Sequence, residues 1–77
     1  MDSEEIKEKI KEYFRENNDY VPEENEDLFE SGVLDSYGVV DFLTFLEEKL
    51  NASINIEDIT MENFSTIEKI TSLIQNK

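Results

Sequence analysis

The sequence of 77 residues contains no cysteine and no histidine. The absence of cysteine excludes disulfides, a thiolate zinc site and a cysteine nucleophile. The absence of histidine removes the most common general base, the Ser-His catalytic pairs and most catalytic metal sites. We therefore expect no metal site and no catalytic residue in this chain, and we do not expect it to be an enzyme.

Positive charge is also scarce. Seven Lys and Arg residues stand against 20 Asp and Glu residues, which gives a formal net charge of −13. Such a surface repels the phosphates of nucleic acids and anionic membranes, and it attracts basic partners. We therefore expect protein partners with basic docking surfaces and no nucleic acid.

Long hydrophobic runs are missing as well. No apolar stretch approaches the ~20 residues that a membrane-spanning helix needs. Met1 to Glu12 also lacks the apolar segment of a signal peptide, so we expect a cytoplasmic protein. Hydrophobic residues still make up 38% of the chain, which is too many for a disordered acidic tail. The length predicts a single domain over residues 1–77, and we expect a monomer.

Apolar residues recur at helical spacing in the first half of the chain. They predict a helix over residues 3–17, with Asp2 or Ser3 as its cap, and a second helix over residues 36–50. The long loop between them carries enough apolar residues to be ordered against the core. The residues of these segments expected in the core are Ile6, Ile10, Tyr13, Phe14, Val21, Leu28, Phe29, Val33, Leu34, Val39, Val40, Phe42, Leu43, Leu46 and Leu50.

The second half of the chain predicts shorter helical elements. A helical turn is expected around Glu57–Met61, and Ser65-Thr66-Ile67-Glu68 is a capping box that starts the last helix, with Ser65 accepting from the N–H of Glu68. The predicted fold is all-α: a small helical bundle of three main helices plus one short helix. The further residues expected in its core are Ile54, Ile56, Ile67, Ile70 and Ile74.

Ser36 is the serine whose position is most informative. It follows Asp35 at the end of the long loop and opens the predicted second helix, where its hydroxyl would project outward. A phosphate attached there would be stabilised by the positive end of the helix dipole. The alternative is that Asp35 or Ser36 only caps the helix. No base stands beside Ser36 in the sequence, which argues against a self-activated nucleophile.

A polar stripe starts beside Ser36. Its members recur at i, i+4, i+7 and i+11 and so share one helix face: Tyr37, Asp41, Thr44 and Glu48, with Glu47 at the border. An exposed aromatic ring with a ladder of carboxylates suits docking to a basic partner. The alternative is a solvated face of an acidic protein. Tyr37 favours docking, because a solvated face needs no aromatic residue.

The run Leu28-Phe29-Glu30-Ser31-Gly32-Val33-Leu34-Asp35-Ser36-Tyr37, followed by an acidic amphipathic helix, resembles the acyl carrier protein family. That family has an Asp-Ser-Leu-like motif at the start of its second helix. The resemblance covers nearly the whole chain, including its length, its acidity and the order of its helices.

The resemblance implies that Ser36 carries a 4′-phosphopantetheine arm, which a phosphopantetheinyl transferase moves from coenzyme A. The thiol of the arm would hold an acyl or aminoacyl group as a thioester, for enzymes that load and accept this cargo. Asp35 would assist docking to the transferase. Asp41, Glu47 and Glu48 match the acidic recognition positions of the family.

The chain departs from the fatty-acid carriers at four positions. Tyr37 replaces the usual leucine or methionine, Gly38 stands where an acidic residue is usual, and Phe42 and Phe45 are bulkier than the usual aliphatic residues. These departures fit a specialised carrier at least as well, such as an aminoacyl or D-alanyl carrier or one for secondary metabolites. Fatty-acid and polyketide biosynthesis stay open. Because Phe42 and Phe45 would narrow the space beside the second helix, we expect a small or polar cargo.

A non-covalent acidic interaction module that binds a basic partner protein is the alternative function. The net charge supports this alternative equally well. It gives no reason, however, for the Asp35-Ser36 pair at the start of a helix.

Overall fold

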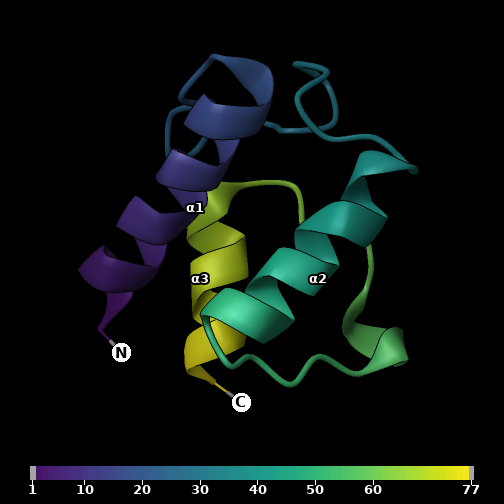
Figure 1. Ribbon diagram of the computed structural model, residues 1–77. Helices are drawn as coiled ribbons and strands as arrows, with labels where there is room; N and C mark the ends of the chain where they lie inside the picture. Colours follow the sequence, from purple (N-terminus) through teal and green to yellow (C-terminus); the bar gives the residue numbers. More distant parts are fainter. Residues whose placement is uncertain (1, 77) are drawn as a thin grey trace.

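The computed structural model describes residues 2–76, and Met1 and Lys77 lie outside the described residues. Its elements are α1 (Ser3–Asn18), α2 (Gly38–Lys49), the 3₁₀ turn η1 (Ile56–Asp58) and α3 (Ile67–Gln75). Figure 1 shows α3 between the other two helices, and α1 packs against α3. No strand occurs over residues 2–76. The predicted all-α class is confirmed.

The ends of α1 follow from its sequence. Asp2 caps the helix because its Oδ1 accepts a hydrogen bond from the N–H of Glu5 at 2.8 Å. At the other end Asp19 adopts the left-handed conformation, with a φ of 53°, and donates its N–H to the carbonyl of Arg15. This geometry closes the helix one residue later than the sequence predicts.

The helix α2 begins at Gly38, two residues later than expected. Asp35 and Ser36 therefore belong to the turn before the helix. The prediction that Ser36 opens the helix is wrong by this margin. The Asp35 side chain accepts hydrogen bonds from the backbone N–H groups of this turn.

The entry to α3 also differs from the predicted capping box. Thr66 is the cap, since its hydroxyl accepts from the N–H of Lys69 at 3.0 Å. Ser65 instead donates its hydroxyl to the carbonyl of Glu62 at 3.1 Å. The extended backbone at Thr66, with φ −137° and ψ 157°, places that residue and not Ser65 at the cap position. The short helix expected around Glu57–Met61 is only the 3₁₀ turn η1.

Aromatic rings occupy the centre of the core. The fully buried Phe14 and Phe42 stack with ring centroids 5.3 Å apart, and Phe64 meets Phe42 edge-on at 6.3 Å. Their neighbours include all of the most deeply buried aliphatic residues, Ile6, Ile10, Leu28, Leu34, Leu46, Leu50, Ile67 and Ile70. Within residues 2–76 no helix is both long enough and apolar enough to cross a membrane.

Three residues expected in the core lie at the surface. Val21 is 37% exposed, Val40 60% and Ile56 87%. Pro22 is buried next to Val21 and takes its place as the anchor of that segment. Val40 and Ile56 have no such replacement, because they face outward from α2 and from η1.

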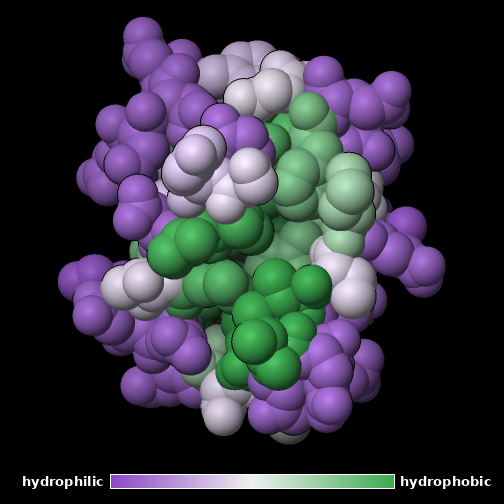
Figure 2. Space-filling view, turned by 90° about the vertical axis from the view of Figure 1, so that its right-hand side faces the viewer, coloured by the Kyte–Doolittle hydropathy of each residue, from purple (hydrophilic) through white to green (hydrophobic). Residues whose placement is uncertain are grey.

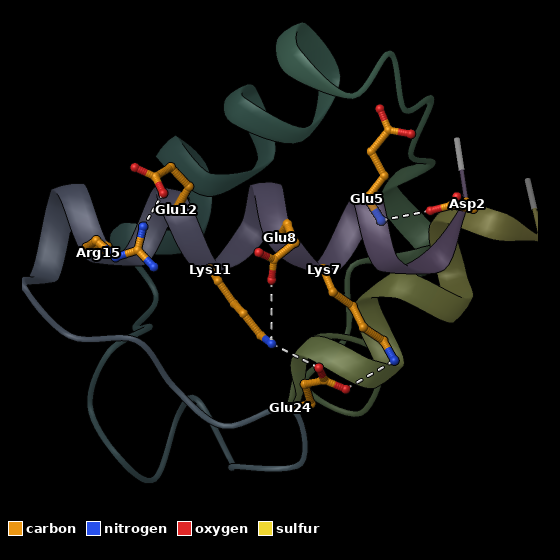
Figure 3. A network of polar contacts seen from close by, with 8 residues as sticks. All are labelled: Asp2, Glu5, Lys7, Glu8, Lys11, Glu12, Arg15 and Glu24. Atoms are coloured by element: carbon orange, nitrogen blue, oxygen red, sulfur yellow. Dashed lines mark hydrogen bonds and ion pairs between the residues drawn. The ribbon is translucent and has the colours of Figure 1, made fainter.

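The long loop before α2 is bound to α1 and to the start of α3. Glu24 forms ion pairs with Lys7 at 3.1 Å and Lys11 at 2.9 Å, both on α1, as Figure 3 shows. The carbonyl of Glu24 accepts from the N–H of Glu68 at the start of α3, at 3.0 Å. These contacts order the segment that leads to Ser36.

Candidate functional site

Ser36 lies in the turn that connects the long loop with α2, and it is exposed. Over residues 2–76 its hydroxyl forms no hydrogen bond with another group. The hydroxyl is therefore accessible to an enzyme.

Asp35 organises this turn. Its Oδ1 accepts hydrogen bonds from the N–H of Tyr37 at 3.1 Å and from the N–H of Gly38 at 2.6 Å. Its carbonyl oxygen accepts from the N–H of Val39 at 2.9 Å. Asp35, and not Ser36, thus satisfies the free N–H groups at the start of α2. Because the N–H groups of Tyr37 and Gly38 donate to Asp35, they are not available to a phosphate attached to Ser36. The stabilisation of such a phosphate that the sequence predicts does not come from these two groups.

Gly38 fits closely against Asp35. A Cβ atom at this position would lie 3.2 Å from Oδ1 of Asp35, which is tighter than an ordinary contact. The missing side chain at Gly38 lets the Asp35 carboxylate come within 2.6 Å of the Gly38 nitrogen. The glycine at position 38, where fatty-acid carriers usually have an acidic residue, therefore has a local structural reason.

An open pocket of about 470 Å³ adjoins Ser36. Its walls come from the long loop, from α2 and from the segment after η1, and they are mostly apolar: Phe29, Leu34, Val39, Ile59, Met61 and Phe64, with Asp35, Ser36 and Thr60 completing the lining. The pocket is large enough for a small organic group.

Phe42 and Phe45 do not fill this pocket, contrary to the expectation from the sequence. Phe42 points into the core between Phe14 and Phe64. Phe45 packs on Tyr13 of α1, with ring centroids 4.6 Å apart. Both rings pack against rings of α1, so they give no reason to expect a small cargo.

The predicted stripe lies on the outer side of α2 and the turn before it. Tyr37 is 86% exposed and precedes the first helical residue. Asp41, Thr44, Glu47 and Glu48 are all exposed on the helix itself. The hydroxyl of Thr44 donates to the carbonyl of Val40 at 3.2 Å. The charged groups among these residues are the carboxylates of Asp41, Glu47 and Glu48.

Comparison with known proteins decides the family. The family described as the phosphopantetheine attachment site matches residues 4–74. The chain belongs to this family. It is a carrier with covalently attached 4′-phosphopantetheine.

The carrier is similar to D-alanyl carrier proteins of streptococci. It is 40% identical over 48 residues to the D-alanyl carrier protein of Streptococcus suis (strain 05ZYH33), covering 62% of this chain and 61% of the relative. It is 35% identical over 51 residues to that of Streptococcus pyogenes serotype M5 (strain Manfredo), covering 66% of this chain and 65% of the relative. The chain thus spans about 61–65% of the length of these relatives.

The sequence did not reveal the pocket of the carrier. Its walls combine Phe29, from the loop, with Ile59 and Phe64, which follow η1. These residues belong to segments without helical periodicity, so no pattern groups them. The Asp35-Ser36 pair was the one signal for this region, and the pocket is formed around it.

Proposed function

We propose that Ser36 is the attachment site of the phosphopantetheine arm and that the chain carries an acyl or aminoacyl group. The observation that supports this proposal is the exposed, unbonded Ser36 hydroxyl in a turn that Asp35 holds in shape. When bound, the arm supplies the thiol on which cargo is held as a thioester. Asp35 keeps the Ser36 hydroxyl outside the helix, where a transferase can reach it.

The residues around Ser36 fit such a group. The hydroxyl is exposed, and the adjoining pocket of about 470 Å³ offers apolar walls beside it. Part of an arm or its cargo could be sheltered from water there. Because the pocket is open and apolar, it accommodates small cargo and does not require a charged one.

Aminoacyl transfer, as the names of the D-alanyl carrier relatives imply for those proteins, is the pathway that we propose for this carrier. Fatty-acid and polyketide biosynthesis are less well supported, because the motif departs from fatty-acid carriers at Tyr37 and Gly38. The intact mass of the carrier isolated from its native cell would identify the cargo directly.

Docking is proposed to run along the acidic face of α2, through Tyr37, Asp41, Thr44, Glu47 and Glu48. A carrier that visits several enzymes needs fast and weak contacts, and opposite charges on its partners accelerate the encounter. We also propose that the chain is one carrier domain over residues 1–77, monomeric and cytoplasmic, with loading and accepting enzymes that have basic docking surfaces.

The attachment site is tested by replacing the hydroxyl. Ser36→Ala removes the acceptor, whereas Ser53→Ala removes an exposed serine hydroxyl elsewhere in the chain. Each variant is incubated with coenzyme A and a phosphopantetheinyl transferase, and its intact mass is measured. We expect the parent and Ser53→Ala to gain one arm and Ser36→Ala to gain none, with unchanged circular dichroism. An arm on Ser36→Ala would show that another residue is the acceptor.

A further inference from the structure

An open groove of about 230 Å³ lies between α1 and α2. The half-buried rings of Tyr13 and Phe45 line it, with their centroids 4.6 Å apart. Its other lining residues are exposed charged side chains from both helices, Lys9, Glu12, Glu16 and Lys49. We call these six residues the α1–α2 groove.

The α1–α2 groove is separate from the pocket beside Ser36. Figure 2 shows the side of the molecule on which η1 lies, with apolar surface surrounded by hydrophilic residues. Among residues 2–76, no residue lines both the pocket and the groove. Phe45 and Lys49 follow Asp41 at i+4 and i+8, so the groove borders the acidic face of α2 on the edge toward α1.

The two lysines of the groove have no ion pair. Within residues 2–76 the salt bridges use other basic residues, Lys7, Lys11 and Arg15. Neither Lys9 nor Lys49 forms one there, although the chain has 20 acidic residues. Lys49 is also the only Lys or Arg between residues 16 and 68. The groove therefore carries positive charge that no carboxylate of the described chain neutralises by contact.

The two glutamates of the groove do not cancel this charge. Glu12 forms its ion pair with Arg15. Glu16 is seven residues after Lys9 and therefore lies about 10 Å further along α1. The groove thus has a basic end, at Lys9 and Lys49, and an acidic end, at Glu16.

Tyr13 adds a hydrogen-bond donor to the groove. Within residues 2–76 its hydroxyl forms no hydrogen bond. Burial and the negative charge of Asp41 raise the pKa of the Tyr13 hydroxyl, so the group stays protonated and is able to donate.

The complementary ligand is a carboxylate beside a large apolar side chain. The lysines attract the carboxylate, the Tyr13 hydroxyl donates to it, and the apolar side chain covers the rings of Tyr13 and Phe45. A nucleic acid, an anionic membrane or a second copy of this chain would be repelled by the net charge of −13. The occupant that fits the groove is therefore a partner protein.

The distance from Ser36 indicates which partner this is. The helix α2 extends about 10 Å from Gly38 to Phe45, and Ser36 lies before Gly38. The transferase acts on the Ser36 hydroxyl itself, whereas a loading enzyme acts on the thiol at the end of the arm. A loading enzyme therefore does not need to cover Ser36, and its contact surface can extend along α2 to the groove.

We propose that the α1–α2 groove is a docking site for the enzyme that loads the cargo, which places a carboxylate and a large apolar side chain in it. This inference rests on the proposed arm at Ser36 and its cargo. Basic groups of the same enzyme would meet Asp41 and Glu48 on the acidic face. A shift of the enzyme along α2 would bring these basic groups to Lys49, so the groove fixes the position of the partner by repulsion as well as by attraction.

The test reverses one charge of the groove. Lys49→Glu is compared with Lys69→Glu, which makes the same change at an exposed lysine of α3 that also lacks an ion pair within residues 2–76. The loading enzyme of the native cell charges the holo carrier, and the intact mass of the carrier gives the rate. We expect kcat/KM for loading to fall about tenfold in Lys49→Glu. Lys69→Glu should load at the parent rate or slightly faster, because added negative charge attracts a basic partner.

A second variant tests the hydroxyl. Tyr13→Phe keeps the ring and should lower kcat/KM for loading about threefold, the cost of one hydrogen bond. Transfer of the arm from coenzyme A should keep the parent rate in Tyr13→Phe and Lys49→Glu, because the transferase acts at Ser36. Circular dichroism and thermal unfolding verify that every variant keeps the fold.

Three results would overturn the inference. The first is a parent rate of loading in Lys49→Glu, and the second is an equal loss in Lys69→Glu. The third is an equal loss of arm transfer in Lys49→Glu, which would assign the groove to the transferase.

Failure of the proposed function has a different signature. An arm on Ser36→Ala refutes the attachment site, and a holo parent that the enzyme does not load refutes the cargo together with the partner proposed for the groove. A parent that is loaded, with Lys49→Glu loaded equally fast, refutes the groove alone.

Discussion

Asp35 and Gly38 together shape the turn around Ser36. The Asp35 carboxylate accepts two backbone N–H bonds, and the absence of a side chain at Gly38 permits the shorter one, at 2.6 Å. The position of the Ser36 hydroxyl therefore depends on a neighbouring residue and on a missing side chain. Neither effect involves Ser36 itself, which is free for an enzyme to act on.

Glu24 binds the long loop to α1 through its side chain and to α3 through its carbonyl. Hydrogen bonds from Lys11 and Lys7 hold the pKa of the Glu24 carboxyl below its ordinary value. The same contacts raise the pKa of both lysines. A carboxyl whose folded pKa is lowered stabilises the fold above its unfolded pKa, and the contribution disappears as pH falls through the folded value.

Glu24→Gln should therefore lower the melting temperature by a few degrees at pH 7. The difference from the parent should shrink as pH falls below 4.5, the ordinary value for glutamate. Glu23→Gln removes the same charge at the adjacent, exposed position and serves as the control. Thermal unfolding between pH 7 and pH 3 measures both. Equal effects of the two variants, or a difference that persists at pH 3, would contradict the role of the ion pairs.

The helix α2 separates two tasks on its two sides. Its inner side carries Phe42 and Leu46 into the core, and Phe45 packs on Tyr13 of α1. These contacts anchor the helix, because aromatic rings bury large apolar areas. The outer side then has no packing role, and Asp41, Glu47 and Glu48 are exposed on it.

Reversal of two charges on α2 tests this side. Asp41→Lys with Glu48→Lys should lower kcat/KM for arm transfer about tenfold or more at low salt, because electrostatic steering is lost. Helicity should not change, since both side chains are exposed. Glu4→Lys with Glu16→Lys makes the same change in net charge on α1. Equal rates for both pairs of variants, measured at low and high salt, would place the docking face elsewhere.

The whole molecule carries more negative charge than its ion pairs can balance. The net charge is −13. Over residues 2–76 the salt bridges involve Lys7, Lys11 and Arg15, all on α1. The carboxylates of the long loop and α2 therefore repel one another with few cations between them, and such repulsion destabilises a compact chain.

Added NaCl should raise the melting temperature of the apo carrier by several degrees, because exposed charges are screened over ~8–10 Å near physiological ionic strength. An uncharged solute at the same osmolality is the control for general effects on hydration. Thermal unfolding monitored by circular dichroism gives both curves. A melting temperature that stays flat or falls with salt would show that the ion pairs of α1 outweigh the repulsion.

The sequence by itself determined the main helices and most of the core. Periodic apolar residues identified α1, the inner side of α2 and α3, because helix burial depends on spacing along the chain. The acidic composition and the Asp35-Ser36 pair pointed to a carrier, and the family match agrees. These features are local, so they can be seen in one stretch of residues at a time.

Only the tertiary structure decided which helix ends are capped by which side chain and which apolar residues stay in water. Thr66 replaces Ser65 as a cap because the backbone that enters α3 is extended there. Val40 and Ile56 fit an apolar pattern yet remain exposed, since the core was already filled by Phe42 and its neighbours. The pocket beside Ser36 joins two stretches that are distant in the sequence, residues 29–39 and 59–64. Burial and pockets depend on the neighbours that the fold brings together, and spacing along one segment carries no information about them.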